Sequence, residues 1–235
     1  MLRTMNRLSP LNPCRPGQLL LATVALLVLA LPAKAEEPSA APIDIGSRRE
    51  LLIDDFLVGS LTSSAVQRLH HPVRKEIAIV HDAPWEGNGG GYHAIFHDPG
   101  FRGTGLYRMY YHAWHIPSDG NQAHPLYIGY AESGDGVHWV KPKLGLVEHD
   151  GSTANNIVLA TINGDRCHDF SPFKDPNPRV APGEEYKAVG YGFKPKGLYA
   201  FKSPDGIHWS LYNQSKPVIT GHPFDTQNIT FWDPQ

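Results

Sequence analysis

One seven-residue element occurs twice in the sequence, 70 residues apart. Residues 133–139 (Ser-Gly-Asp-Gly-Val-His-Trp) and 203–209 (Ser-Pro-Asp-Gly-Ile-His-Trp) share the pattern Ser-x-Asp-Gly-x-His-Trp. Each element closes a longer unit that begins with an Asp-Pro pair and continues with an aromatic run, at residues 106–111 in the first unit and 185–191 in the second. A repeat of this length, built from short strands and turn residues, predicts a radial or stacked array of small β-sheets.

Four strands are expected in each unit, because runs of β-branched and aromatic residues are separated there by Gly, Pro, Asp and Asn. The expected strands cover residues 93–97, 106–114, 126–132 and 137–141 in the first unit, and 170–174, 186–193, 197–202 and 207–212 in the second. Gly136 and Gly206 supply the positive φ that a tight hairpin needs. Trp139 and Trp209 are expected to fill the gap between neighbouring sheets. No window after residue 35 shows helical periodicity, so the predicted class is all-β.

The first 35 residues predict an export signal. Arg3, Arg7 and Arg15 precede a near-apolar run at residues 19–31, and residues 33–35 (Ala-Lys-Ala) offer small side chains where a signal peptidase cleaves. The apolar run is too short to span a bilayer, which needs about 20 residues. The mature protein is therefore expected to be secreted or periplasmic, without membrane contact after cleavage.

The net charge argues against some classes of partner, and the cysteine content argues against an internal disulfide. Removal of residues 1–35 takes away four basic residues and no acidic one, so 17 of the 21 basic residues remain against 23 acidic residues. The resulting net charge of −6 disfavours nucleic acid and anionic membranes as partners. Only Cys167 remains in the mature chain, so an internal disulfide is not expected.

Three carboxylates occupy comparable places ahead of an Asp-Pro pair, namely Glu86, Asp169 and Asp225. In a propeller, the loops that enter the innermost strands open onto the ligand face, so one rim is expected to carry all three. Glycoside hydrolysis requires one carboxyl group as acid and another as base or nucleophile. The alternative is that these carboxylates cap turns and bond loop amides.

Other polar and aromatic residues near the three carboxylates fit a sugar-binding surface. The candidates for substrate binding are Trp85, His93, His168 and Gln227. Trp114 fits either the same surface or the core between sheets. No pair among the 13 histidines has a recognised metal-ligand spacing such as H-E-x-x-H, so neither a metal nor a cofactor is expected.

Taken together, the repeated Asp-Pro pair, the aromatic second strand and the seven-residue hairpin resemble the five-bladed β-propellers of the invertase, levansucrase and arabinanase superfamily, which comprises glycoside hydrolase families 32, 43, 62 and 68. The hairpin also resembles the Asp-box of sialidase-type propellers, a folding motif distant from the ligand. The resemblance covers residues 64–235 and implies an incomplete array of about two and a half blades. The implied division is a signal peptide at 1–35, a linker and N-terminal segment at 36–63, and blade units at 80–142, 160–212 and 220–235.

This resemblance implies a secreted, glycoside hydrolase-like protein that binds or cleaves a carbohydrate. In a glycosidase, Asp169 would stabilise positive charge at the anomeric carbon, and Glu86 or Asp225 would act as nucleophile or base. The Asn-Asp-Pro-Asn-Gly, Arg-Asp-Pro and Glu-Cys motifs of family 32 are not present in full, and the acid would lie in a later blade, so this fragment is expected to be inactive. The alternatives are a non-catalytic carbohydrate-binding propeller and a protein-interaction scaffold.

Overall fold

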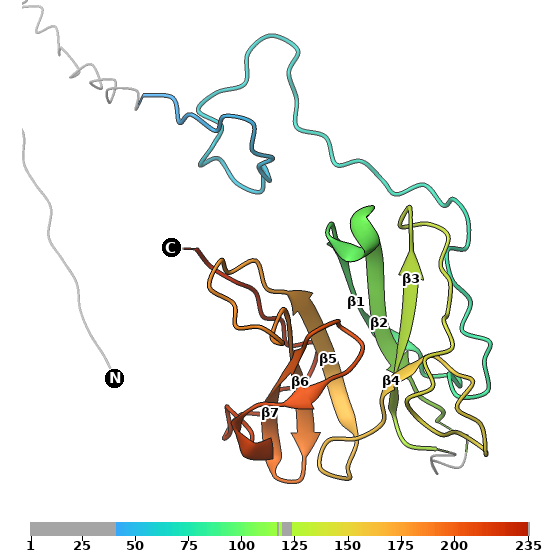
Figure 1. Cartoon of the computed structure of the whole chain (residues 1–235). Coiled ribbons are helices and arrows are strands. Elements are labelled where there is room, and N and C mark those ends of the chain that lie inside the picture. Colours follow the sequence, from blue (N-terminus) through green and yellow to red (C-terminus); the bar gives the residue numbers. More distant parts are fainter. Residues whose placement is uncertain (1–40, 117, 119–123, 235) are drawn as a thin grey trace, which may run out of the picture. The chain divides into compact units, whose positions relative to one another are not determined.

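The computed structural model describes residues 41–116, 118 and 124–234, and this part of the chain is all-β (Figure 1). Two four-stranded antiparallel sheets follow one another, with the strands of each in chain order. The described residues form no α-helix, and none of their helical segments has the length and apolar character needed to cross a bilayer. The all-β prediction is confirmed, whereas the predicted signal peptide lies outside the described residues.

The first sheet consists of β1 (Gly91–Asp98), β2 (Leu106–Ala113), β3 (Tyr127–Ser133) and β4 (Ile157–Leu159). The second consists of β5 (Cys167–Lys174), β6 (Tyr186–Phe193), β7 (Lys196–Ser203) and β8 (Ser210–Leu211). Two single turns of 3-10 helix, η1 (Phe101–Gly103) and η2 (Asn213–Ser215), lie after β1 and β8.

The strand predicted at residues 137–141 is wrong. Val140 forms only an isolated bridge with Glu132, and Pro142 soon removes a backbone donor, so the pairing does not continue. The outer strand of the first sheet is instead β4, whose Ile157 and Val158 are buried. Burial of these apolar side chains favours β4 over the more exposed segment at 137–141. The other expected strands form with ends within three residues of those predicted.

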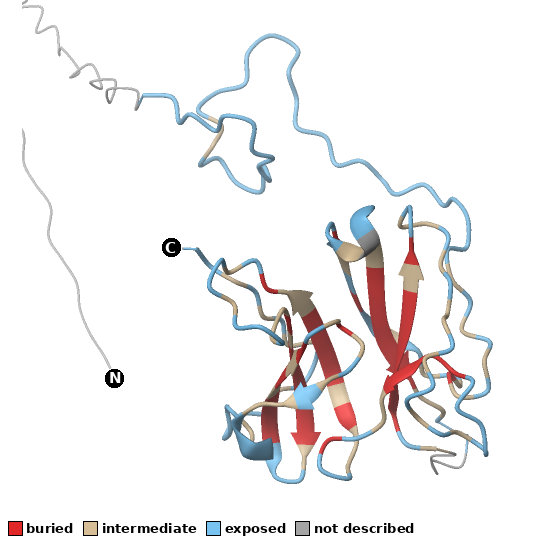
Figure 2. Ribbon diagram, in the orientation of Figure 1, coloured by how far each residue is buried: buried red, intermediate tan, exposed pale blue. Residues whose placement is uncertain are grey.

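The described chain divides into two units, residues 41–71 and residues 72–234. In the first unit the described residues form turns and bends but no strand or helix, and Leu51, Ile53 and Phe56 are exposed (Figure 2). In the second unit, buried residues are concentrated on the strands (Figure 2). Both sheets belong to this second unit.

The two sheets share one aromatic core. Strands β1, β2 and β3 contact β5, the first strand of the second sheet. The Trp209 ring centroid lies 6.2 Å from that of Tyr110 on β2 and 5.1 Å from that of Phe170 on β5. Trp209 therefore fills the space between the sheets, as predicted. Trp139 packs instead against a smaller cluster within the first sheet that includes Met109 and Tyr111.

A buried carboxylate, Asp98, joins the sheets by polar contacts. Its side chain accepts hydrogen bonds from Arg108 Nε at 3.0 Å, Lys174 Nζ at 2.6 Å and the Tyr186 hydroxyl at 2.5 Å. Arg108 belongs to the first sheet, whereas Lys174 and Tyr186 belong to the second. Burial raises the pKa of Asp98, but the bonds from Lys174 and Tyr186 and the charge of Arg108 outweigh it and hold this pKa below its ordinary value. Asp98 is therefore an ionised anchor between the sheets.

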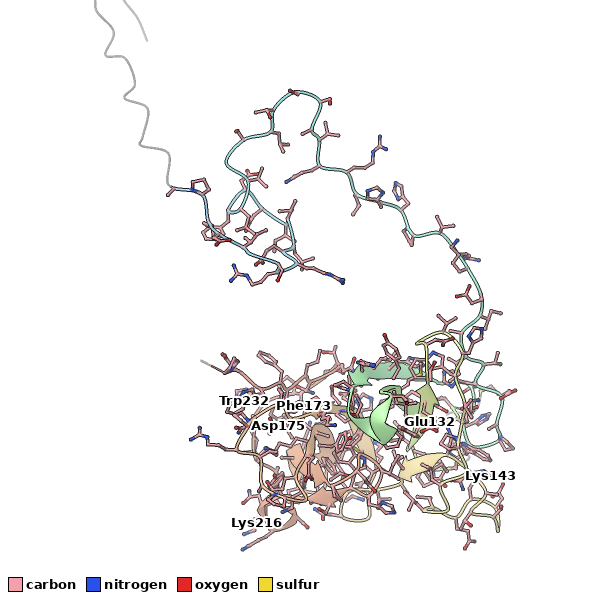
Figure 3. The ribbon with its side chains drawn as sticks, turned by 45° about the horizontal axis from the view of Figure 1, so that its top comes forward. Glu132, Lys143, Phe173, Asp175, Lys216 and Trp232 are labelled. Carbon is pink, nitrogen blue, oxygen red and sulfur yellow. The ribbon has the colours of Figure 1, made fainter. Side chains whose placement is uncertain are left out.

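The second sheet repeats half of this arrangement. Asp175, labelled in Figure 3, comes directly after the last residue of β5, and Asp98 is the last residue of β1. The Asp175 carboxylate accepts a hydrogen bond from Lys187 Nζ at 2.5 Å. Lys187 on β6 and Arg108 on β2 occupy equivalent positions. Each pairs with the residue two positions before the Asp, Lys187 with Phe173 and Arg108 with Phe96. The Lys187 side chain is 29% exposed, whereas that of Arg108 is fully buried.

Asp98→Asn is expected to lower the free energy of unfolding by about 3–5 kcal/mol, because it leaves Arg108 buried without a counter-charge. The matched variant Asp175→Asn should cost only about 1 kcal/mol, since solvent screens its partly exposed lysine partner. Urea unfolding of the full chain measures both values. Equal losses in the two variants would contradict a special role for Asp98 between the sheets.

The Ser and Asp side chains of the two seven-residue elements form the same hydrogen bonds within their turns. The hydroxyl oxygen of Ser133 accepts the backbone N–H groups of Asp135 and Gly136, and that of Ser203 does the same for the corresponding residues. In each element the Asp carboxylate accepts the next two backbone N–H groups. The second element also contacts the other sheet, since the Tyr110 hydroxyl donates to the Gly206 carbonyl at 2.7 Å. These side chains stabilise turns, as a folding motif would.

Gly136→Ala and Gly206→Ala form a matched test of this contact. Both glycines have positive φ, 79° and 77°, so alanine should cost about 1–2 kcal/mol of strain at either position. A Cβ at Gly206 would also lie 2.8 Å from Arg108 Nη1 and 2.9 Å from the Tyr110 hydroxyl, whereas a Cβ at Gly136 has 3.6 Å of clearance. We expect Gly206→Ala to lose a further 1–3 kcal/mol or so, measured by urea unfolding. A larger loss for Gly136→Ala would refute this difference.

Candidate functional site

The first strands of the two sheets carry the same backbone irregularity. The pairing of β1 with β2 shifts register between residues 91 and 94, and that of β5 with β6 shifts between residues 168 and 171. Tyr92 and Asp169 lie in these two shifts, each six residues before the Asp of an Asp-Pro pair, and have φ values of 50° and 60°. Positive φ costs a residue other than glycine on the order of 1–3 kcal/mol, and such bulges re-aim side chains near functional sites.

Side chains from β1, β2 and β5 meet beside the two bulges. The ring centroids of Tyr92 and His112 lie 4.7 Å apart, those of Tyr92 and His168 5.2 Å, and those of His112 and His168 4.9 Å. Asp169 joins the group through its backbone, because its N–H donates to His112 Nε2 at 2.9 Å. His112 and Asp169 are buried, while the His168 side chain is 17% exposed. The group therefore extends from the buried interface between the sheets to the surface.

His112 is held in its neutral form with a defined proton position. Burial, together with the neighbouring His168 and His93, lowers the pKa of His112 to about 3. Because Nε2 accepts the Asp169 N–H, the single proton of the neutral ring lies on Nδ1. Among the described residues, Nδ1 has no hydrogen-bond partner.

His112, His168 and Asp169 are also the group of described residues that could hold a metal ion, since one ligand atom of each lies within 4.8 Å of the others. Coordination needs an unprotonated nitrogen of His112. Its Nε2 already accepts the Asp169 N–H and its Nδ1 carries the proton. The geometry therefore suits a hydrogen-bonded group better than a metal centre.

His168 and Asp169 form a close pair of imidazole and carboxylate. His168 Nδ1 lies 2.6 Å from Asp169 Oδ1, although the contact is not aligned as a hydrogen bond. A buried carboxylate beside Nδ1 favours the proton on that nitrogen, which leaves Nε2 as an acceptor for a ligand. Asp169 is thus placed to position His168 rather than to touch a ligand itself.

A pocket of about 300 Å³ opens beside His168. It is lined by Trp114, Arg166, His168, Tyr191, Phe193, Pro223 and Asp225. Aromatic rings therefore share the pocket with a guanidinium group, an imidazole and a carboxylate. Among its lining residues, Asp225 supplies the only carboxylate, and this exposed side chain accepts the neighbouring Thr226 N–H at 2.8 Å.

Glu86 does not line this pocket. Its fully buried carboxylate accepts hydrogen bonds from the Tyr111 hydroxyl at 2.5 Å, Lys141 Nζ at 2.7 Å and the Ala83 N–H at 2.8 Å, and His81 lies 3.4 Å away. Burial raises the pKa of Glu86, but these bonds outweigh it and lower the pKa to about 2. A catalytic role for Glu86 stays a prediction, and its contacts are those of a structural residue.

The remaining predicted residues also lie outside the lining of the pocket. Trp85 donates from Nε1 to Asn156 Oδ1 at 2.7 Å and packs against buried residues of the first sheet. His93 is exposed, with Nε2 3.0 Å from His81 Nε2. Gln227 is half-buried, close in sequence to Asp225. Of the seven predicted residues, His168 and Asp225 line the pocket, and the buried Asp169 contacts His168.

Four residues of the pocket were not predicted from the sequence: Arg166, Tyr191, Phe193 and Pro223. Arg166 directly precedes the Cys-His-Asp segment that contains His168 and Asp169. Tyr191 and Phe193 alternate at the end of β6, so their side chains share one face of the sheet. The alternation of these two aromatic residues is visible in the sequence. That their side chains line a pocket together with Arg166 depends on the tertiary packing.

Comparison of the chain with protein-family models, with curated proteins and with solved structures finds no match. The function is therefore inferred from the chemistry of the site.

The free energy of unfolding is expected to decrease as the pH is lowered, because His112 is buried in its neutral form. The unfolded chain takes up a proton near pH 6.5, whereas folded His112 does so only near pH 3, so folding is opposed as the pH falls through this window. Between pH 8 and pH 5 this effect amounts to about 2 kcal/mol. Urea unfolding at both pH values measures this loss in the unsubstituted protein and in His112→Gln, whose side chain can still accept the Asp169 N–H. The loss of free energy of unfolding between the two pH values should be about 2 kcal/mol smaller in His112→Gln. The same pH dependence in both proteins would contradict a buried, neutral His112.

Proposed function

We propose that the two sheets are blades of a five-bladed β-propeller of the glycosidase type, and that the pocket beside His168 binds a carbohydrate. The propeller is supported by two four-stranded sheets with strands in chain order, joined across β5 and carrying the same bulge and the same Asp-Pro pair. Such a repeat is typical of radial arrays, whose innermost strands carry ligands at one end.

The lining of the pocket is the observation that carries the carbohydrate proposal. Trp114, Tyr191 and Phe193 offer ring surfaces for the C–H face of a sugar, and Arg166, His168 and Asp225 offer charged and polar groups for its hydroxyls. Its volume of about 300 Å³ is at the lower end of the range for ligand pockets, which suits one small ring.

In a hydrolytic reaction, Asp225 would be the base or nucleophile, since it is the carboxylate that lines the pocket. His168, positioned by Asp169, would accept a hydrogen bond at Nε2 from a sugar hydroxyl or from the attacking water. Glycosidases commonly use two carboxyl groups about 5–9.5 Å apart. Because the described lining contains a single carboxylate, a non-catalytic carbohydrate-binding propeller is the second candidate.

Asp225→Asn is expected to weaken sugar binding by roughly 10-fold, because a charge-assisted hydrogen bond to a hydroxyl is replaced by a neutral one. Titration calorimetry of the full chain with a panel of neutral and acidic oligosaccharides measures this. Asp150→Asn serves as the control, because Asp150 is an exposed carboxylate outside the pocket. Release of reducing ends from the same sugars would identify a hydrolase and would contradict the expectation that this fragment is inactive. Failure of every sugar to bind would refute the proposed function.

A further inference from the structure

Arg166 lies between two pockets. The second pocket, of about 540 Å³, is lined by His124, Pro125, Thr161, Gly164, Asp165, Arg166 and Phe193. Arg166 and Phe193 therefore belong to the linings of both pockets. The guanidinium carbon of Arg166 lies 4.3 Å from the centroid of the Phe193 ring. This stacked pair forms a common wall, so a ligand longer than one ring can contact it from both sides.

The guanidinium group of Arg166 forms no close ion pair within the described part of the chain, although its charge helps to lower the pKa of the neighbouring Asp165 carboxylate. Its backbone N–H donates to Asp165 Oδ1, but its side chain forms no hydrogen bond or ion pair there. Arg108 differs in this respect, because its side chain is paired with Asp98. A guanidinium group has five N–H donors in a fixed plane, which match the two oxygens of a carboxylate. Stacking on Phe193 holds that plane in place and lowers the cost of ordering it.

The charges around Arg166 indicate which pocket takes the anion. In the larger pocket the carboxylate of Asp165 is paired with Lys194 at 3.2 Å, so its charge is partly neutralised. In the smaller pocket Asp225 has no ion pair among the described residues, and it would repel an anion. An anionic group is therefore better placed on the side of the larger pocket, with a neutral sugar ring beside Asp225 and His168.

We propose that the ligand is an acidic oligosaccharide and that Arg166 binds the carboxylate of a uronic acid residue in the larger pocket. This inference rests on the proposed function, because it specifies the class of sugar that the same site takes. The uronate carboxylate accepts two parallel N–H bonds from Arg166, and the adjoining sugar occupies the smaller pocket. Arg166 is then the residue that sets specificity for acidic over neutral sugars.

The test compares oligosaccharides of galacturonate, glucuronate and mannuronate with their carboxyl-reduced forms, in which each carboxylate becomes a primary alcohol. Titration calorimetry of the full chain should show at least one acidic sugar binding about 10-fold or more tightly than its reduced form. Arg166→Gln should abolish this preference, because it weakens binding of the acidic sugar about 10-fold more than binding of its reduced form, whereas Arg166→Lys should retain part of it. Arg179→Gln is the control, because Arg179 is exposed and lines neither pocket.

The outcomes separate this inference from the proposed function. Equal affinity for an acidic sugar and its reduced form, or an unchanged preference in Arg166→Gln, would overturn the role of Arg166 while sugar binding stands. A sulfated neutral oligosaccharide that binds as tightly as the uronates would show a general anion site and would also overturn it. Failure of every acidic and reduced sugar to bind would refute both. Thermal unfolding of each variant confirms that it is folded.

Discussion

The carboxylate of Asp98 is the interaction on which the contact between the two sheets depends. It is buried, and it holds one cation of its own sheet and a lysine and a tyrosine of the next. Desolvating such charges is costly unless every partner is in place, so the network tolerates few arrangements of the sheets. The position of β5 against β1 and β2 is thereby restricted. The hydrogen bond between His112 on β2 and Asp169 on β5 spans that same interface, so the geometry of the site depends on Asp98 as well.

Most of the fold was predictable from local patterns. The alternation within residues 186–193 and the turn residues at Asp135-Gly136 each specify a structure without help from distant parts of the chain. The outer strand of the first sheet was not predictable in this way. Residues 137–141 have strand-forming side chains, but β4 competes for the same sheet edge and buries Ile157 completely. The choice between them depends on which apolar side chains reach the core, and sequence alone does not state this.

The candidate site was predictable only where functional residues are neighbours in sequence. His168 and Asp169 were found because they lie side by side before an Asp-Pro pair. His112 was missed, because a histidine in an aromatic strand gives no signal until its strand packs against β5. Glu86 was selected by position, but a tyrosine and a lysine from distant segments enclose its carboxylate. These contacts arise from tertiary packing, so the sequence around Glu86 does not indicate them.

The paired bulges of β1 and β5 have a consequence for how sites of this kind can diversify. The same backbone slot holds Tyr92 in one sheet and Asp169 in the other, with nearly the same φ. A single substitution at this slot exchanges a phenol for a carboxylate and leaves the surrounding hydrogen-bonded frame in place. Chemistry can therefore be redistributed among repeats one residue at a time, so that a symmetric scaffold comes to hold an asymmetric set of reactive groups.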